Sequence, residues 1–195
     1  GIYSLPRIRW GKPEKLALHD NYASGVNWSP TNRQLISAGY DGRLLWINPE
    51  TKKTTREIKA HDFWSWQSAI SPDGKFVASS TGQYLCGGYK YEPAPEKEPS
   101  IRVYEVNTGR EAHHFAHVPP VESVAFSNDG KFLAAGNLMG EVRIWNLETN
   151  KEVARIETDN FTGWGIIKGH YFTGGIFSLA FSPDDSELLL AGMGS

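Results

Sequence analysis

The sequence predicts an all-β fold built from repeated four-stranded antiparallel units, and three observations carry this prediction. Four segments of the 195-residue chain repeat a strand that ends in a serine and a tight turn. Twenty glycines and 11 prolines punctuate the chain, as is typical of short strands joined by turns. We find no convincing stretch with the period of an amphipathic helix.

The repeat is anchored by serines at the end of the first strand of each unit. Successive anchors are 42, 56 and 55 residues apart, so a unit of about 42 residues fits if two units carry insertions of about 14 and 13 residues. The anchors are Ser29, Ser71, Ser127 and Ser182.

The unit at 116–157 shows the expected strands in order. Residues 121–126 predict the first strand, and the turn at 128–130 contains the glycine that a hairpin needs for a positive φ. Turn residues also separate the other three predicted strands, at 132–135, 142–147 and 152–156.

Two further positions recur in the units. A histidine opens each unit, and a bulky aromatic residue lies on the third strand: His19, His61, His117 and His170; Trp46, Tyr104 and Trp145. A four-stranded unit of this length with these residues resembles the WD-repeat β-propeller family. The resemblance implies a hydrogen-bonded set in the first full unit, made of His19, Ser37, Asp41 and Trp46.

The two ends of the chain add partial units. Residues 2–5 resemble a third strand and 16–18 a fourth, whereas 188–191 resemble a second strand. The strands make about four blades' worth. We expect a partial propeller from a native ring of seven blades, the rest of which is missing. A closed four-bladed ring is the alternative, but blades shaped for a seven-fold ring have the wrong wedge angle.

We expect one propeller segment over 1–195 with five divisions. These are 1–18, the end of a preceding blade; 19–59, a blade; 60–115, a blade with an insertion at 82–99; 116–157, a blade; and 158–195, an insertion followed by two strands of a truncated blade.

The insertions, at 82–99 and 159–173, point to the functional face. In a propeller the connections between second and third strands and those between blades emerge on the same side, so both insertions decorate one rim. Aromatic residues on such loops are typical of binding hot spots, although they could instead fold back and cap the core. The predicted binding residues are Trp66, Trp64, Phe63, Glu122, Phe177, Trp164 and Tyr89.

These features predict a protein-interaction scaffold with a protein or peptide partner. The alternatives are a ligand-binding or enzymatic propeller with a pocket over the central channel, and a purely structural segment. No motif for a catalytic nucleophile, phosphate loop or zinc protease is found, and we expect no enzyme activity, cofactor or metal.

Composition and charge exclude further kinds of partner and structure. The net charge of −2 argues against a nucleic-acid partner, and no apolar run is long enough for a membrane span. One cysteine, Cys86, excludes an internal disulfide. The compartment is not determined; a cytoplasmic location is slightly favoured over export.

Overall fold

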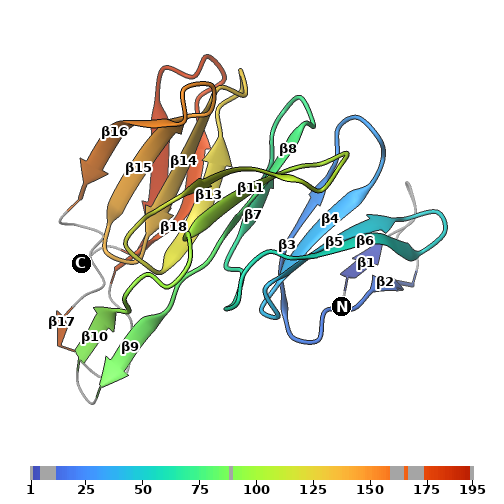
Figure 1. Cartoon of the computed structure of the whole chain (residues 1–195), viewed down its shortest axis with the longest axis horizontal. Helices are drawn as coiled ribbons and strands as arrows, with labels where there is room; N and C mark the ends of the chain where they lie inside the picture. The colour runs from blue at the N-terminus through green and yellow to red at the C-terminus, as the bar shows by residue number, and fades with distance from the viewer. Residues whose placement is uncertain (1, 5–11, 88–89, 159–164, 167–173, 194–195) are drawn as a thin grey trace.

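The computed structural model describes residues 2–4, 12–87, 90–158, 165–166 and 174–193, and all regular structure in these ranges is β-strand. Three four-stranded antiparallel sheets form the body of the molecule (Figure 1), and we call them the first, second and third blades. The all-β fold of partial propeller blades predicted from the sequence is confirmed.

The strands of each blade follow one another in the sequence. The first blade contains β3 (Ala23–Trp28), β4 (Leu35–Gly39), β5 (Arg43–Asn48) and β6 (Lys53–Lys59). The second contains β7 (Ser68–Ile70), β8 (Phe76–Ser80), β11 (Ile101–Glu105) and β12 (Glu111–Phe115). The third contains β13 (Val121–Phe126), β14 (Phe132–Asn137), β15 (Glu141–Asn146) and β16 (Lys151–Glu157).

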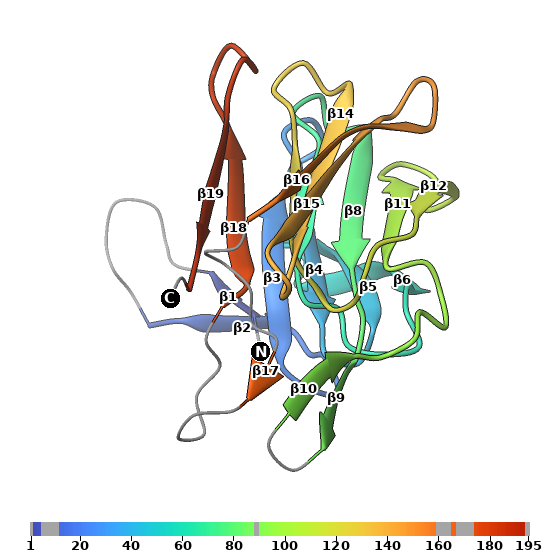
Figure 2. The same cartoon turned by 90° about the vertical axis from the view of Figure 1, so that its left-hand side faces the viewer.

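Shorter sheets flank these blades. The strands β1 (Ile2–Ser4) and β2 (Glu14–Ala17) pair before the first blade, and β18 (Ile176–Phe181) pairs with β19 (Leu188–Gly192) after the third. A further sheet joins the two predicted insertions, because β17 (Gly165–Ile166) pairs with β10 (Lys90–Pro93), which pairs with β9 (Tyr84–Gly87). In Figure 2 this sheet lies at the bottom, opposite the turn that joins β18 to β19.

The anchor serines close the turns between the first two strands of each blade. In the second blade Ser71 Oγ donates to Asp73 Oδ1 at 2.6 Å and accepts from the amide N–H of Phe76 at 2.9 Å. Ser127 makes the equivalent bonds to Asp129 and Phe132 in the third blade. A serine two residues before an aspartate thus satisfies the turn locally, which explains why this pattern repeats.

The hydrophobic core lies between the blades. Trp46, Ile36 and Leu44 pack against Val77 and Tyr104 across the boundary of the first and second blades. Equivalent clusters of buried residues fill the boundary between the second and third blades and the boundary between the third blade and β18–β19. Each blade is therefore stabilised mainly by apolar surface buried against its neighbour.

The first strands of consecutive blades contact one another, β3 with β7, β7 with β13 and β13 with β18. They therefore lie at the inside of the arc. The same register irregularity occurs near the start of β3, β13 and β18, where Ser24, Glu122 and Phe177 fall between paired residues. Such a bulge re-aims one side chain, and these positions lie five residues before the anchor serines.

Candidate protein-interaction face

Five aromatic side chains form a continuous cluster beside the first and second blades. Trp64 stacks with Tyr40 at a centroid distance of 4.7 Å and with Phe63 at 4.9 Å. Trp66 lies across this stack, 5.4 Å from Tyr40 and 5.5 Å from Trp64, at interplanar angles of 72° and 74°. Tyr22 meets Tyr40 edge-on at 6.0 Å and is 75% exposed. We call these residues the aromatic cluster.

Hydrogen bonds to the blades hold the residues of the connection between β6 and β7 in place. The Trp66 amide donates to Ser80 O at 2.9 Å, and its indole N–H donates to Gly82 O at 2.8 Å. The hydroxyl of Thr81 donates to Trp64 O at 2.7 Å. The rings are thus positioned on a rigid support, which is the arrangement expected of a recognition surface.

Glu122 lies beside this cluster at the bulge of β13. Two nearby residues of β13 are bonded to the second blade and to the connection that leads into it. The amide of Val121 donates to Thr81 O, just after β8, at 3.1 Å, and that of Val124 donates to Gln67 Oε1, just before β7, at 2.7 Å. Burial raises the pKa of Glu122 to about 7. The pKa of Tyr40 is also raised, first by burial and then by the negative charge of Glu122.

The structure brings together only part of the predicted binding set. Phe63, Trp64 and Trp66 form the core of the aromatic cluster. The negative charge of Glu122 contributes to the raised pKa of Tyr40, another member of this cluster. Phe177 is 39% exposed on β18, in the sheet beyond the third blade, and makes no ring contact with the cluster within the described ranges. The remaining two predicted residues, Trp164 and Tyr89, lie outside the described residues.

Sequence reasoning missed Tyr22 and Tyr40. Tyr40 directly precedes Asp41 in the connection between β4 and β5, and Tyr22 lies in the connection that leads into β3. Both connections belong to the classes that share a face in a propeller. The aromatic residues of these two connections are the signal that would have identified them.

The hydrogen-bonded set of the first blade differs from the expected one at Trp46. His19 Nδ1 is 2.9 Å from Asp41 Oδ1, and His19 Nε2 is 2.7 Å from Ser37 Oγ. The indole N–H of Trp46 instead donates to Val106 O, a carbonyl of the second blade, at 2.9 Å. The expectation for Trp46 is therefore corrected: this residue links two blades, because its ring is fully buried at their boundary.

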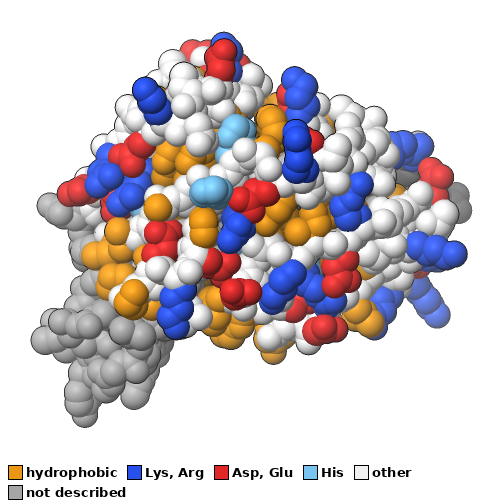
Figure 3. All heavy atoms as spheres, in the orientation of Figure 1, with side chains coloured by type: hydrophobic (Ala, Val, Ile, Leu, Met, Phe, Trp, Pro, Cys, Tyr) orange, Lys and Arg blue, Asp and Glu red, His pale blue; other side chains and the backbone are white. Residues whose placement is uncertain are grey.

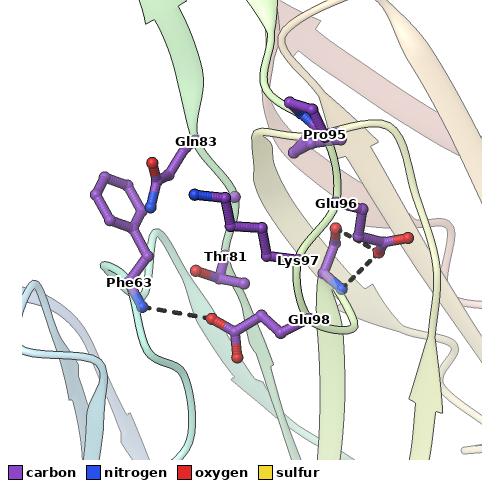
Figure 4. Close-up of a pocket in the computed structure, with 10 residues that line it drawn as sticks. Phe63, Thr81, Gln83, Pro95, Glu96, Lys97 and Glu98 are labelled. Carbon is purple, nitrogen blue, oxygen red and sulfur yellow. Dashed lines mark hydrogen bonds between the residues drawn. The ribbon is translucent and has the colours of Figure 1, made fainter.

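In the second blade a residue of the first insertion takes the place of the missing aspartate. His61 Nε2 is 3.1 Å from Ser79 Oγ, and His61 Nδ1 is 3.6 Å from Glu98 Oε2. Glu98 also accepts the amide N–H of Asp62 at 2.8 Å and that of Phe63 at 3.4 Å (Figure 4). Burial works against ionisation of Glu98, but His61 and these amides hold its pKa below the usual value.

A pocket lies between this segment and the aromatic cluster. Its lining includes Phe63, Glu96, Lys97 and Glu98 (Figure 4), and Lys97 extends toward Phe63 and Gln83. The carboxylates already hold the chain: Glu96 Oε1 accepts from the amide and hydroxyl of Ser100, at 2.9 and 2.7 Å. The pocket therefore lies where hydrogen bonds attach the insertion to the second blade.

The described residues hold no group of three histidine, cysteine or acidic side chains placed to bind a metal ion. Within the same ranges no helix has the length and apolar character to cross a membrane.

The repeated blades, the turn serines and the histidine–carboxylate pairs define a WD-repeat protein. The family model for the WD domain, G-beta repeat, matches residues 13–47, 109–146 and 164–195, and the chain belongs to this family. The matched segment 13–47 begins at the strand before the first blade and ends with β5. The sequence repeat is thus offset from the structural blade by one strand.

The chain is also similar to curated G-protein subunits. It is 23% identical over 176 residues to a guanine nucleotide-binding protein subunit beta from Oryza sativa subsp. japonica, covering 89% of the chain and 42% of that protein. The subunit beta of Lymnaea stagnalis is 25% identical over 184 residues, covering 94% and 47% respectively. The chain spans less than half the length of these relatives. The family and these relatives support a protein-interaction scaffold in general.

Proposed function

We propose that this protein is an interaction scaffold that recognises a protein or peptide partner with the face bearing the aromatic cluster. The observation that carries the proposal is the cluster itself: five rings in contact, contributed by three separate connections of two blades. Aromatic side chains fixed on a rigid fold provide large contact area at low entropic cost. Tyr22, at its exposed edge, is available to a partner.

The charge of this chain fits a protein partner better than a nucleic acid. The chain carries a net charge of −2. On the face shown in Figure 3, positive and negative side chains are interspersed, and hydrophobic side chains show between them. Recognition of nucleic acid depends on a concentrated positive surface.

A binding role is favoured over catalysis in the pocket beside the cluster. Its two glutamates accept backbone N–H groups, as Glu98 does from Asp62 and Glu96 does from His117. An acid–base catalyst needs a carboxylate within reach of substrate. The alternative of an enzymatic propeller therefore gains no support from these carboxylates.

Site-specific crosslinking tests the proposed face. A photoreactive phenylalanine analogue is placed at Tyr22, and a matched control carries it at Val153, which is 52% exposed on the outer strand β16. We expect discrete protein adducts from position 22 and none of the same mass from position 153. Adducts from position 153 alone would overturn the proposal.

A further inference from the structure

We propose that Glu122 and the aromatic cluster form a site for one arginine side chain of a protein partner. The guanidinium would lie between the Glu122 carboxylate and the rings of Tyr40 and Trp66. This inference rests on the proposed function and goes beyond it, because it names the chemical group that the face selects.

The first step is the unusual situation of Glu122. Within the described ranges its carboxylate has no hydrogen bond and no ion pair, although β13 packs against both neighbouring blades. Burial is the cause of its raised pKa, so no described cation compensates its charge. A half-buried carboxylate in this state is stabilised when a partner brings a positive charge.

The second step is the placement of the rings. Backbone amides of β13 before and after Glu122 donate to Thr81 O and to Gln67 Oε1. The hydroxyl of Thr81 donates to the carbonyl of Trp64, and Gln67 directly follows Trp66, so both bonds bring Glu122 close to these residues. The ring of Trp66 stands nearly perpendicular to the Tyr40–Trp64 stack. Perpendicular rings beside a carboxylate offer a cation both ring faces and an opposite charge.

The third step is the choice of cation. Arginine has a planar guanidinium that stacks on aromatic rings and donates two parallel hydrogen bonds to a carboxylate. The protein's own Arg43, at the start of β5, is engaged by Asp20, Asp41 and Glu57 at 2.8–2.9 Å. Lys97 lies in the pocket beside Phe63 and Glu98. Within the described residues no cation pairs with Glu122, and we assign the arginine to a partner molecule.

Two small probes that differ in charge test this proposal on the wild-type chain. Acetyl-arginine amide and its neutral isostere acetyl-citrulline amide are titrated at pH 8, where Glu122 is mostly ionised, and the indole N–H signals are followed by NMR. We expect saturable shifts at Trp64 and Trp66, with arginine bound about tenfold more tightly than citrulline. Equal binding of the two probes, or no saturable shift at these indoles, would overturn the proposal.

The isosteric substitution Glu122→Gln gives the second measurement, and Glu148→Gln, on the exposed turn between β15 and β16, is its matched control. Glu122→Gln should reduce the preference for arginine to about twofold or less, and the control should leave it unchanged. Retention of the preference in Glu122→Gln would refute the role of this carboxylate. Loss of arginine binding with crosslinks intact at position 22 rejects the arginine site alone, whereas loss of crosslinks with arginine binding intact rejects the proposed function.

Discussion

The first and third blades have the same strand order and nearly the same register, but the histidine that precedes each blade has different hydrogen-bond partners. In the first blade His19 pairs with Asp41 and Ser37. In the third, His117 accepts the Val118 N–H at Nδ1, and its Nε2 is 3.3 Å from Ala135 O. The architecture therefore does not depend on one particular set of hydrogen bonds.

The difference has a steric cause at the end of the second strand. The third blade has Asn137 there, whose amide donates to Val118 O and accepts from the backbone of the next turn. The equivalent residue of the first blade is Gly39, and a Cβ there would lie 2.4 Å from His19 Nδ1. A side chain at Gly39 would therefore clash with the ring of His19, whereas the third blade holds both the ring of His117 and the side chain of Asn137.

The largest expected effect comes from a glycine pair, one in each blade. Gly42 and Gly130 both have φ of +72°, but a Cβ at Gly42 would lie 2.1 Å from His61 O, whereas one at Gly130 meets nothing within 4 Å. Gly42→Ala should lower the free energy of unfolding by about 4 kcal/mol or more, and Gly130→Ala by about 1 kcal/mol. Urea denaturation measures both, and equal losses would contradict the steric argument.

The second prediction compares the Asp41 carboxylate of the first blade with the Asn137 amide of the third. Asp41 is held ionised: burial raises its pKa, but hydrogen bonds from Arg43 and His19 outweigh this and lower it to about 2. Asp41→Ala leaves Arg43 and His19 without this partner and should cost about 3–4 kcal/mol, against about 2 kcal/mol for the neutral Asn137→Ala. Chemical denaturation at pH 7 measures the difference. A larger loss for Asn137→Ala would show that the charge is not the dominant contribution.

The smallest effect is a difference in pH dependence caused by His117. Burial, together with the charge of Arg143, lowers its pKa to about 3, so the folded protein keeps this ring neutral. Its contribution to stability is present above the ordinary histidine pKa of about 6.5 and is lost as pH falls from there toward 3. Between pH 8 and pH 5 the wild type should lose about 2 kcal/mol more than His117→Gln.

His114→Gln is the matched control for that experiment. The His114 side chain is 63% exposed and its ion pair with Glu111 lies at the surface, so its substitution should change the stability little. Because the comparison is between variants measured at the same pH, contributions from Glu122 and the other ionisable groups cancel. Identical slopes for wild type and His117→Gln would contradict the prediction.

The sequence could predict the features that arise from neighbouring residues. The serine, aspartate and glycine of each turn are bonded within a few positions of one another, as at Ser127–Gly130. Spacing therefore predicted the repeated four-stranded units. It could not find Glu98 as the partner of His61, because this residue lies near the end of an insertion whose path depends on packing.

The residues of the proposed binding face also divide into those that the sequence predicted and those that only the tertiary structure revealed. The sequence by itself determined the all-β repeat, since alternation and turn chemistry are local, and it predicted a shared face for the connections that carry Phe63, Trp64 and Trp66. Tertiary structure alone decided that Tyr22 and Tyr40 join those rings and that Trp46 bonds to the next blade. It also decided that Phe177 stays apart on β18. These outcomes depend on how one blade packs against the next, and contacts between distant segments carry no signature in either segment alone.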